Sequence, residues 1–308
     1  MKSKLALYLR AFRVNQWLKN FVIFTAIIFS GQLFNGDLFL KSVEAFFLFC
    51  LLSSTSYVLN DIIDYPYDKK HPVKKFRPIA SGQITIQHAT FLVFIMTVIS
   101  LVLSLFISVR FFSISFIFIL LHFFYSLHLK KHPVVDIFTI SFSFMLRTFA
   151  GEIATGFHIP IWLLFTIFFG SLFVATVKRH AELVSHGRET RESLFFYKEH
   201  LLDFLTNTFA TATIIAYSFY TYLEKIEQLG AEDAPFTKFF SSLYPQFELR
   251  RWMMVTIPFV VYGISRYAQL LYEREEGERP EKIITKDIPL VATIVLWALT
   301  VILILYVF

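Results

Sequence analysis

The chain has 308 residues, of which 56% are hydrophobic, and its mean hydropathy of +0.59 exceeds that of soluble proteins, which are roughly 45–50% apolar. Its apolar runs approach the length of about 20 residues that crosses a hydrocarbon core, which excludes a soluble globular domain and predicts an all-α polytopic membrane protein. The single cysteine, Cys50, excludes an internal disulfide and a thiolate zinc cluster. A net charge of +6 favours anionic lipid headgroups or phosphorylated substrates over nucleic acid, for which no basic groove with interleaved aromatic residues is visible.

The N-terminal segment, residues 1–19, is basic and precedes the first apolar run. Its apolar residues Leu5, Leu9, Phe12 and Trp17 roughly follow one helical stripe, which is typical of an interfacial helix that lies on the membrane. No small-x-small site follows the first apolar run, so we expect this segment to be retained rather than cleaved as a signal peptide.

Nine membrane-spanning helices are predicted within one integral-membrane domain over residues 1–308. They are expected at residues 20–35, 38–59, 88–109, 111–129, 133–156, 161–178, 204–223, 252–272 and 287–308. With the N-terminus in the cytoplasm, 22 of the 29 Lys and Arg residues lie on cytoplasmic segments and six on the opposite side. The positive-inside rule therefore predicts this orientation, with the segments 60–87, 130–132 and 179–203 on the cytoplasmic side.

An acidic motif follows the second predicted span, where the sequence reads Asn60-Asp61-Ile62-Ile63-Asp64-Tyr65-Pro66-Tyr67-Asp68. On a helix, Asp61, Asp64 and Asp68 point within roughly 60° of one another, although Pro66 is expected to interrupt the helix near Asp68. Carboxylates at a helix C-terminus oppose the helix dipole, so a stabilising cation is expected. We predict that Asp61 and Asp64 hold Mg²⁺ with help from Asp68 and Asn60, because Mg²⁺ takes one or two carboxylates together with phosphate oxygens and water. The alternative is a solvated acidic helix end.

Cations follow the acidic motif in the same loop. They are Lys69, Lys70, Lys74, Lys75 and Arg77, and Pro78-Ile79-Ala80-Ser81-Gly82 comes next. Cations beside carboxylates are expected where a phosphate-rich ligand binds with Mg²⁺. The positive-inside rule alone accounts for Lys69, Lys70 and Lys75, so Lys74 and Arg77 are the candidates for phosphate contacts.

The fifth predicted span contains buried charge. Asp136 and Arg147 are eleven residues apart, which places them on one helical face, roughly 16 Å apart along the axis. A cation that faces lipid at this depth costs at least about 2.5–3.5 kcal/mol, so Arg147 is expected to face the interior and meet an anion. Glu152 in the same span is an alternative, purely structural partner.

The motif NDxxDxxxD followed by RPIASG resembles the first signature of the UbiA superfamily of intramembrane prenyltransferases. The resemblance covers essentially the whole chain. It implies a nine-helix bundle in the inner (cytoplasmic) membrane, with a central cavity that opens to the lipid and is capped by cytoplasmic active-site loops.

Further stretches resemble one branch of that superfamily, the decaprenyl-phosphate (polyprenyl-phosphate) phosphoribosyltransferases. Residues 13–20 are similar to the RxxQWxKN opening of this branch. Other matches are Tyr125-Ser126, Lys130-Lys131-His132-Pro133, Asp136, Phe144-Met145-Leu146-Arg147 and Lys178-Arg179-His180-Ala181-Glu182-Leu183.

The segment after the sixth predicted span departs from the wider superfamily, whose ordinary members carry a second Asp-rich motif there. Residues 178–203 contain no DxxxD pattern and offer Lys178, Arg179, Glu182, Arg188 and Arg191 instead. One Asp-rich motif indicates one metal–diphosphate site, and the cationic segment suits a phosphate bound without a second metal. The alternative is a local ion pair of Lys178 or Arg179 with Glu182.

The resemblance implies Mg²⁺-dependent transfer of 5-phosphoribose from phosphoribosyl diphosphate to a polyprenyl phosphate, with release of diphosphate. Asp61, Asp64 and Asp68 are the implied catalytic residues. The implied substrate-binding residues are Gln16, Lys19, Asn60, Lys74, Arg77, Tyr125, Asp136, Arg147, Lys178, Arg179 and Glu182.

Two other functions stay open. An aromatic prenyltransferase with an isoprenyl diphosphate donor would explain the first Asp-rich motif but not the missing second one. A cation-coupled transporter would use Asp61 and Asp64 as an ion site, but transporters tend to show interrupted spans near mid-membrane in paired halves, which this sequence lacks.

Overall fold

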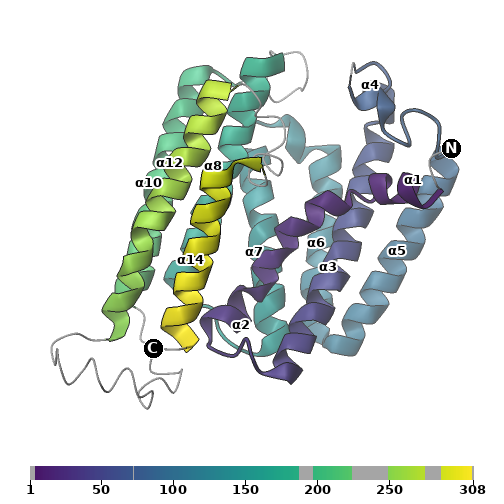
Figure 1. The fold of residues 1–308 in the computed structure, drawn as a ribbon. Coiled ribbons are helices and arrows are strands. Elements are labelled where there is room, and N and C mark those ends of the chain that lie inside the picture. The colour runs from purple at the N-terminus through teal and green to yellow at the C-terminus, as the bar shows by residue number, and fades with distance from the viewer. Residues whose placement is uncertain (1–3, 72, 187–196, 224–248, 275–285, 307–308) are drawn as a thin grey trace.

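The computed structural model describes residues 4–71, 73–186, 197–223, 249–274 and 286–306, which form a bundle of helices (Figure 1). In chain order the elements are α1 (Lys4–Ala11), η1 (Val14–Phe24), α2 (Thr25–Phe29), α3 (Gly36–Ile63), α4 (Tyr65–Asp68), η2 (Lys74–Phe76), α5 (Ile86–Ile107), α6 (Val109–Leu127), η3 (Leu129–Lys131), α7 (Val135–Thr155), α8 (Ile161–His186), α10 (Glu199–Leu223), η7 (Leu249–Thr256), α12 (Ile257–Arg274) and α14 (Ile288–Tyr306). No strand occurs in these ranges, so the all-α class expected from the sequence is confirmed.

Six of the described helices are long and apolar enough to cross a membrane: α3, α5, α6, α7, α14 and residues 161–184 of α8. The prediction of nine spans is therefore confirmed only in part. The first predicted span is divided between η1 and α2, which together make a short apolar segment, Val14–Phe29. Two other predicted spans coincide with α10 and α12, whose hydropathy is lowered by Thr and Tyr in α10 and by Arg266 and Gln269 in α12.

Polar caps and one glycine set several helix boundaries. At the start of α3, Oδ1 of Asn35 accepts the N–H of Leu38 at 3.3 Å. Ser108 has extended backbone and ends α5, and its Oγ accepts the N–H of Phe111 at 3.0 Å to begin α6. Such caps satisfy backbone donors that a helix end leaves unpaired. Gly156 ends α7 with φ +78°, a left-handed conformation that glycine adopts without strain.

The central helix α7 packs against helices on two sides. Figure 1 shows α3, α5 and α6 on one side of it and α8, α10, α12 and α14 on the other. The irregular segment η1 lies directly against α7, because a Cβ on Gly151 would meet the carbonyl oxygen of Ile23 at 2.0 Å. Only glycine permits this close approach of the two backbones.

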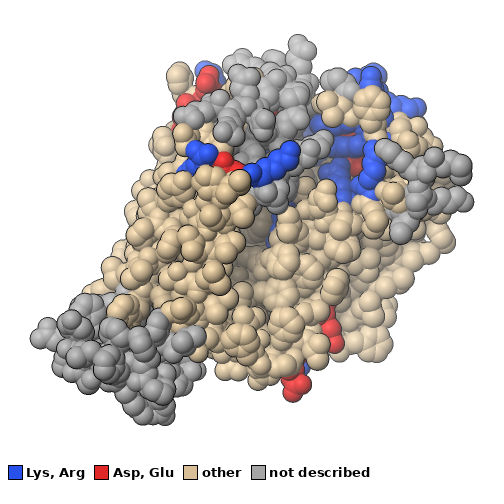
Figure 2. Space-filling view, viewed as in Figure 1, with Lys and Arg blue, Asp and Glu red and all other residues tan. Residues whose placement is uncertain are grey.

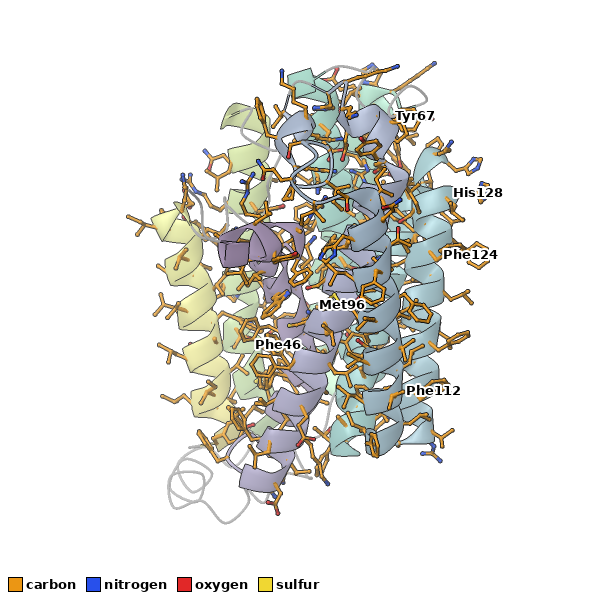
Figure 3. All side chains as sticks on the ribbon, turned by 90° about the vertical axis from the view of Figure 1, so that its right-hand side faces the viewer. Phe46, Tyr67, Met96, Phe112, Phe124 and His128 are labelled. Carbon is orange, nitrogen blue, oxygen red and sulfur yellow. The ribbon has the colours of Figure 1, made fainter. Side chains whose placement is uncertain are left out.

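The outer surface separates an apolar belt from a charged end. Phe94, Phe106 and Leu299 are among the exposed apolar side chains of α5 and α14, as expected where helices face lipid tails. In Figure 3, Phe124 projects away from the bundle, whereas Tyr67 and His128 lie at the end that carries α4. Lys and Arg gather at that same end in Figure 2, while the middle of the molecule is nearly free of charge on this face.

Candidate active site at the charged end of the bundle

The acidic motif lies at the junction of α3 and α4. Asp64 is the C-cap of α3, and α4 begins immediately afterwards with Pro66 in its first turn. The helix therefore breaks at Asp64, earlier than the position near Asp68 that we expected from the sequence. In a continuous helix the ring of Pro66 would collide with the carbonyl group of Ile62, so the chain bends first. Asp61 remains on α3 and Asp68 ends α4, and the three carboxylates do not share one continuous helical face.

The carboxylates of Asp61 and Asp68 share one arginine. The NH1 nitrogen of Arg77 lies 3.0 Å from Oδ1 of Asp61 and 2.6 Å from Oδ2 of Asp68. Arg13 pairs with the same oxygen of Asp61 across 48 residues of sequence. Both carboxylates are 4% exposed, so their charges need these partners. Burial raises the pKa of Asp68, and the guanidinium of Arg77 opposes that rise.

Asn60 and Asp64 form a second polar group with Lys130. Nδ2 of Asn60 donates to Oδ2 of Asp64 at 2.9 Å. Nζ of Lys130 donates to Oδ1 of Asp64 and lies 3.2 Å from Oδ1 of Asn60. The sequence did not single out Lys130 or Arg13, although both lie in stretches that resemble the phosphoribosyltransferase branch. That resemblance was the signal that could have identified them.

The turn between α1 and η1 directs Arg13 toward the acidic motif. Arg13 has left-handed backbone, with φ 50° and ψ 51°, and its carbonyl accepts the N–H of Gln16 at 2.7 Å. Nε1 of Trp17 donates to Oγ of Ser54 at 3.0 Å, which fastens η1 to α3. The predicted site residues Gln16 and Lys19 are both half-buried on this fastened segment.

Four predicted site residues meet in one buried network. Nε of Arg179 donates to Oδ2 of Asp136 at 2.6 Å, and NH1 donates to Oε2 of Glu182 at 2.7 Å. NH2 lies 3.4 Å from the hydroxyl of Tyr125. The side chains of Arg179 and Asp136 are 2% and 0% exposed. The structure thus contains the Arg179–Glu182 pair that the sequence offered as an alternative to phosphate binding, and it adds Asp136 to it.

Tyr197, which the sequence did not single out, completes this network. Its hydroxyl donates to Oδ1 of Asp136 at 2.8 Å and accepts the N–H of Val134 at 2.6 Å. Burial raises the pKa of Tyr197, so the hydroxyl keeps its proton. Val134 has φ 67°, which is unusual for a β-branched residue, and the N–H of Val135 donates to the carbonyl of Pro133 at 2.8 Å. The network therefore holds a strained turn at the start of α7, and nothing in the sequence distinguishes Tyr197 from an ordinary packing tyrosine.

Arg147 lies buried, 2% exposed, in the interior of α7. Its Nε donates to Oδ1 of Asn20 at 2.7 Å, and NH2 lies 3.3 Å from Oγ of Ser53. NH1 donates to the carbonyl oxygen of Ser143 at 2.7 Å and also to its hydroxyl. The guanidinium carbon stands 4.7 Å from the ring centre of Phe118, within cation–π range.

Within the described residues, the hydrogen-bond acceptors of Arg147 are neutral oxygens, and the expectation that it meets an anion stays a prediction. Glu152, the structural partner considered from the sequence, instead pairs with Nδ1 of His158 at 2.8 Å and accepts the N–H of Ile159 at 3.2 Å. Asp136, the other acidic residue of α7, forms its ion pair with Arg179. Arg147 therefore joins η1, α3 and α7 through neutral groups, and its guanidinium lies near two aromatic rings, that of Phe118 and, at 5.4 Å, that of Phe144.

The remaining predicted site residues are Lys74, which begins η2, and Lys178, which precedes Arg179 on α8. Both side chains are half-buried. Figure 2 shows red carboxylate atoms enclosed by blue Lys and Arg atoms at the charged end, on the side where the N-terminus lies. The arrangement can neutralise several phosphate charges at once.

Within the described residues, no three His, Cys, Asp or Glu side chains are grouped closely enough to hold a metal ion by themselves. The donor chemistry nevertheless fits Mg²⁺. Oxygens of Asp61 and Asp68 converge on a single cationic nitrogen of Arg77, and hard oxygen ligands of this kind suit Mg²⁺ when phosphate oxygens and water complete the shell. Two surface hollows, around Thr208 on α10 and around Glu152, are not lined by the acidic motif, so the implied central cavity stays a prediction.

Comparison with known proteins decides the family. Residues 20–223 match the UbiA prenyltransferase family. The chain belongs to this family. It is 32% identical to the decaprenyl-phosphate phosphoribosyltransferase of Mycolicibacterium smegmatis, over 95% of this chain and 90% of that protein. It is 29% identical to the protein of the same name from Corynebacterium glutamicum, over 97% of this chain and 86% of that protein. The resemblance to the UbiA superfamily and to this branch is confirmed, and the chain is a multi-pass membrane transferase.

Solved UbiA structures share the fold. A UbiA homolog from Archaeoglobus fulgidus bound to DMAPP and Mg²⁺ superposes with a TM-score of 0.70 at 18% identity, covering 97% of this chain and 98% of that chain. The bundle is therefore UbiA-like. At this identity the likeness shows the fold alone, and the ligands belong to the archaeal protein.

Proposed function

We propose that this protein transfers 5-phosphoribose from phosphoribosyl diphosphate to a decaprenyl-type polyprenyl phosphate, in an Mg²⁺-dependent reaction that releases diphosphate. One observation carries the proposal: Asp61, Asp64 and Asp68 are enclosed by Arg13, Arg77 and Lys130 at one end of an apolar bundle. Carboxylates supply metal ligands, and the cations supply partners for phosphates. The relatives from M. smegmatis and C. glutamicum are named decaprenyl-phosphate phosphoribosyltransferases, which supports the phosphoribosyl group and the lipid phosphate acceptor of this proposal.

The donor diphosphate is assigned to the acidic motif. Asp61 and Asp64 hold Mg²⁺, Asp68 and Asn60 assist, and the bound metal supplies Lewis-acid stabilisation of the leaving group. The side chains that contact the phosphates of the two substrates are Arg13, Gln16, Lys19, Lys74, Arg77, Lys130 and Lys178. Tyr125, Asp136, Arg179 and Glu182 hold the adjoining ends of α6, α7 and α8 together.

The reaction breaks the bond between C1 of the ribose and an oxygen of the diphosphate. A phosphate oxygen of the acceptor forms the new bond to C1. This oxygen is already anionic near neutral pH, so the step needs no strong general base. Cations fixed beside the departing diphosphate neutralise charge where it develops, which is the main electrostatic contribution expected of the protein.

The polarity of the two substrates indicates how the site is placed relative to the membrane. The long apolar tail of the acceptor suits the lipid-facing belt, where Phe94 and Phe106 are exposed. The phosphorylated donor is water-soluble and suits the charged end. We therefore place the protein in the inner membrane with its N-terminus and site toward the cytoplasm, in agreement with the excess of Lys and Arg on those segments.

The test uses purified protein in detergent, phosphoribosyl diphosphate labelled in its ribose, a polyprenyl phosphate and Mg²⁺. Label is expected to enter the lipid phase, and EDTA is expected to abolish the transfer. Asp64→Asn should abolish turnover while the protein stays folded, because it removes the charge of a metal ligand, keeps the size of the side chain and lies at a position that is 24% exposed. Full activity in this variant would contradict the assigned metal site.

A second outcome separates this proposal from its alternative. The UbiA-like fold also suits an aromatic prenyltransferase that takes an isoprenyl diphosphate donor. If no label enters lipids of several lengths while an isoprenyl diphosphate and an aromatic acid do react, the phosphoribosyl proposal is wrong and the alternative stands.

A further inference from the structure

Three carboxylates and three cations neutralise one another at the charged end of the bundle. The cations come from three separate stretches of the chain, since Arg13 precedes η1, Arg77 follows η2 and Lys130 lies in η3. Oδ1 of Asp61 accepts from both arginines, and Asp68 accepts from Arg77. Lys130 donates to Oδ1 of Asp64. The group is therefore electrically balanced as it stands.

These pairs are not solvated surface contacts. The carboxylates of Asp61 and Asp68 are 4% exposed, and the side chain of Lys130 is 13% exposed. A buried carboxylate without a counter-charge is strongly unfavourable, so removing its partner demands a replacement. Mg²⁺ can replace the cations at the carboxylates, because it takes the same oxygens as ligands.

Binding of Mg²⁺ without a diphosphate would leave the site with an excess of positive charge. If the metal takes the oxygens of Asp61 and Asp64, then Arg13 and Lys130 lose their counter-charges, and Arg77 keeps only Asp68. The local charge becomes positive, which opposes metal binding. A diphosphate removes this opposition, because its oxygens accept from the released cations while others bind the metal.

On the basis of the proposed function, we infer that Arg13, Arg77 and Lys130 are exchangeable counter-ions that leave the carboxylates for the donor's diphosphate, so that metal and diphosphate bind cooperatively. Each ligand then raises the affinity of the other by the same factor. The exchange keeps a free divalent cation from occupying the site without its substrate. It also narrows the phosphate contacts proposed above for Arg13 and Lys130 to the diphosphate of the donor.

Arg13→Gln is the principal test variant. The side chain of Arg13 is 26% exposed, and Asp61 keeps Arg77 as a partner after the substitution. Lys130→Gln is the second variant, since Asp64 keeps Asn60. Arg10→Gln is the matched control, because Arg10 lies one turn earlier in α1 and donates to the carbonyl of Phe76 at 3.1 Å rather than to a carboxylate.

Two affinities are measured on the full chain in detergent. Mn²⁺ replaces Mg²⁺ in the first measurement, because it prefers the same oxygen ligands and its unbound form gives an electron paramagnetic resonance signal. The loss of this signal measures Mn²⁺ binding in the absence of any phosphate. Binding of labelled pyrophosphate is followed by equilibrium dialysis in excess Mg²⁺. The inference predicts opposite changes in Arg13→Gln and Lys130→Gln: Mn²⁺ binds about tenfold tighter and pyrophosphate about tenfold weaker. Arg10→Gln should change neither. A residue that only supports the fold would weaken both.

The outcomes separate the inference from the proposed function. If the wild type binds Mn²⁺ alone as tightly as both variants while Mg²⁺-pyrophosphate still binds, the cations do not compete with the metal and the inference is wrong, but the proposed function stands. If pyrophosphate binds to no form of the protein at any Mg²⁺ concentration, the proposed diphosphate site itself is wrong.

Discussion

Lys178 and Arg179 are neighbours on α8 with different surroundings. The side chain of Arg179 is 2% exposed and is held between Asp136 and Glu182. Lys178 is half-buried and points from a different face of the helix, since adjacent residues differ by about 100°. The two cations should therefore contribute to different properties of the protein.

Substituting them in turn separates stability from binding. Arg179→Met leaves Asp136 buried with an uncompensated charge, so we expect a loss of about 3–5 kcal/mol, measured as a lower midpoint of thermal unfolding in detergent. Lys178→Ala should leave that midpoint nearly unchanged and weaken the binding of a phosphate-bearing substrate. If Lys178→Ala alters the affinity for neither the donor nor the acceptor, its proposed role is excluded.

At the scale of elements, one glycine determines how η1 meets α7. A Cβ on Gly151 would lie 2.0 Å from the carbonyl oxygen of Ile23, so alanine must push the two backbones apart. Gly151→Ala is expected to destabilise the protein by about 1–3 kcal/mol and to reduce activity, because η1 carries Gln16 and Lys19. Thermal unfolding and the transfer assay measure the two effects.

Gly263→Ala is the matched control for this substitution. Gly263 lies in α12, where an added Cβ has no heavy atom within 4 Å. Alanine there should be neutral or stabilising by about 0.5–1 kcal/mol, since a helical glycine is less favourable than alanine. Equal effects at both positions would show that helix propensity, rather than contact with η1, governs Gly151.

Tyr197, two residues before α10, connects this segment to the start of α7. Tyr197→Phe removes the acceptor of the Val134 N–H and one donor to Asp136 while keeping the ring in place. Leaving such buried groups unsatisfied costs about 1–3 kcal/mol. We expect faster hydrogen exchange at the start of α7. Tyr222→Phe, at an exposed site on α10, should leave exchange there unchanged; equal exchange in both variants would mean that Tyr197 does not hold this turn.

The part of the structure that sequence could predict is the part that depends on local pattern. The apolar runs place α3, α5, α6, α7, α8 and α14, because lipid requires each span to satisfy its own backbone. The acidic motif predicts Asp61 and Asp64 as metal ligands because their chemistry is local, and this assignment stays a prediction. Arg13 and Lys130 reach these carboxylates across 48 and 66 residues, and such contacts depend on helix packing that no spacing reveals. The first apolar run divides into η1 and α2, which both pack against α7, and its sequence pattern did not predict this division.

At the scale of the whole molecule, the acidic motif and the cations around it lie at one end of an apolar belt. A water-soluble donor must reach that end from the side of the membrane where it is available. The excess of Lys and Arg on these segments predicts that this side is the cytoplasm. The orientation therefore determines which substrates the site can meet.

Thiol labelling in cells tests this orientation. Cys50→Ser gives a background without thiols and keeps an acceptor for Nδ2 of Asn20, which lies 3.2 Å from the sulfur. Into it we place Gln83→Cys, exposed at the charged end, or Gly36→Cys at the opposite end, where an added Cβ meets nothing within 4 Å. A membrane-impermeant maleimide added to spheroplasts should label Gly36→Cys alone, and permeabilisation should expose both thiols. Labelling of Gln83→Cys from outside would reverse the topology, and a donor confined to the cytoplasm could then not reach the acidic motif.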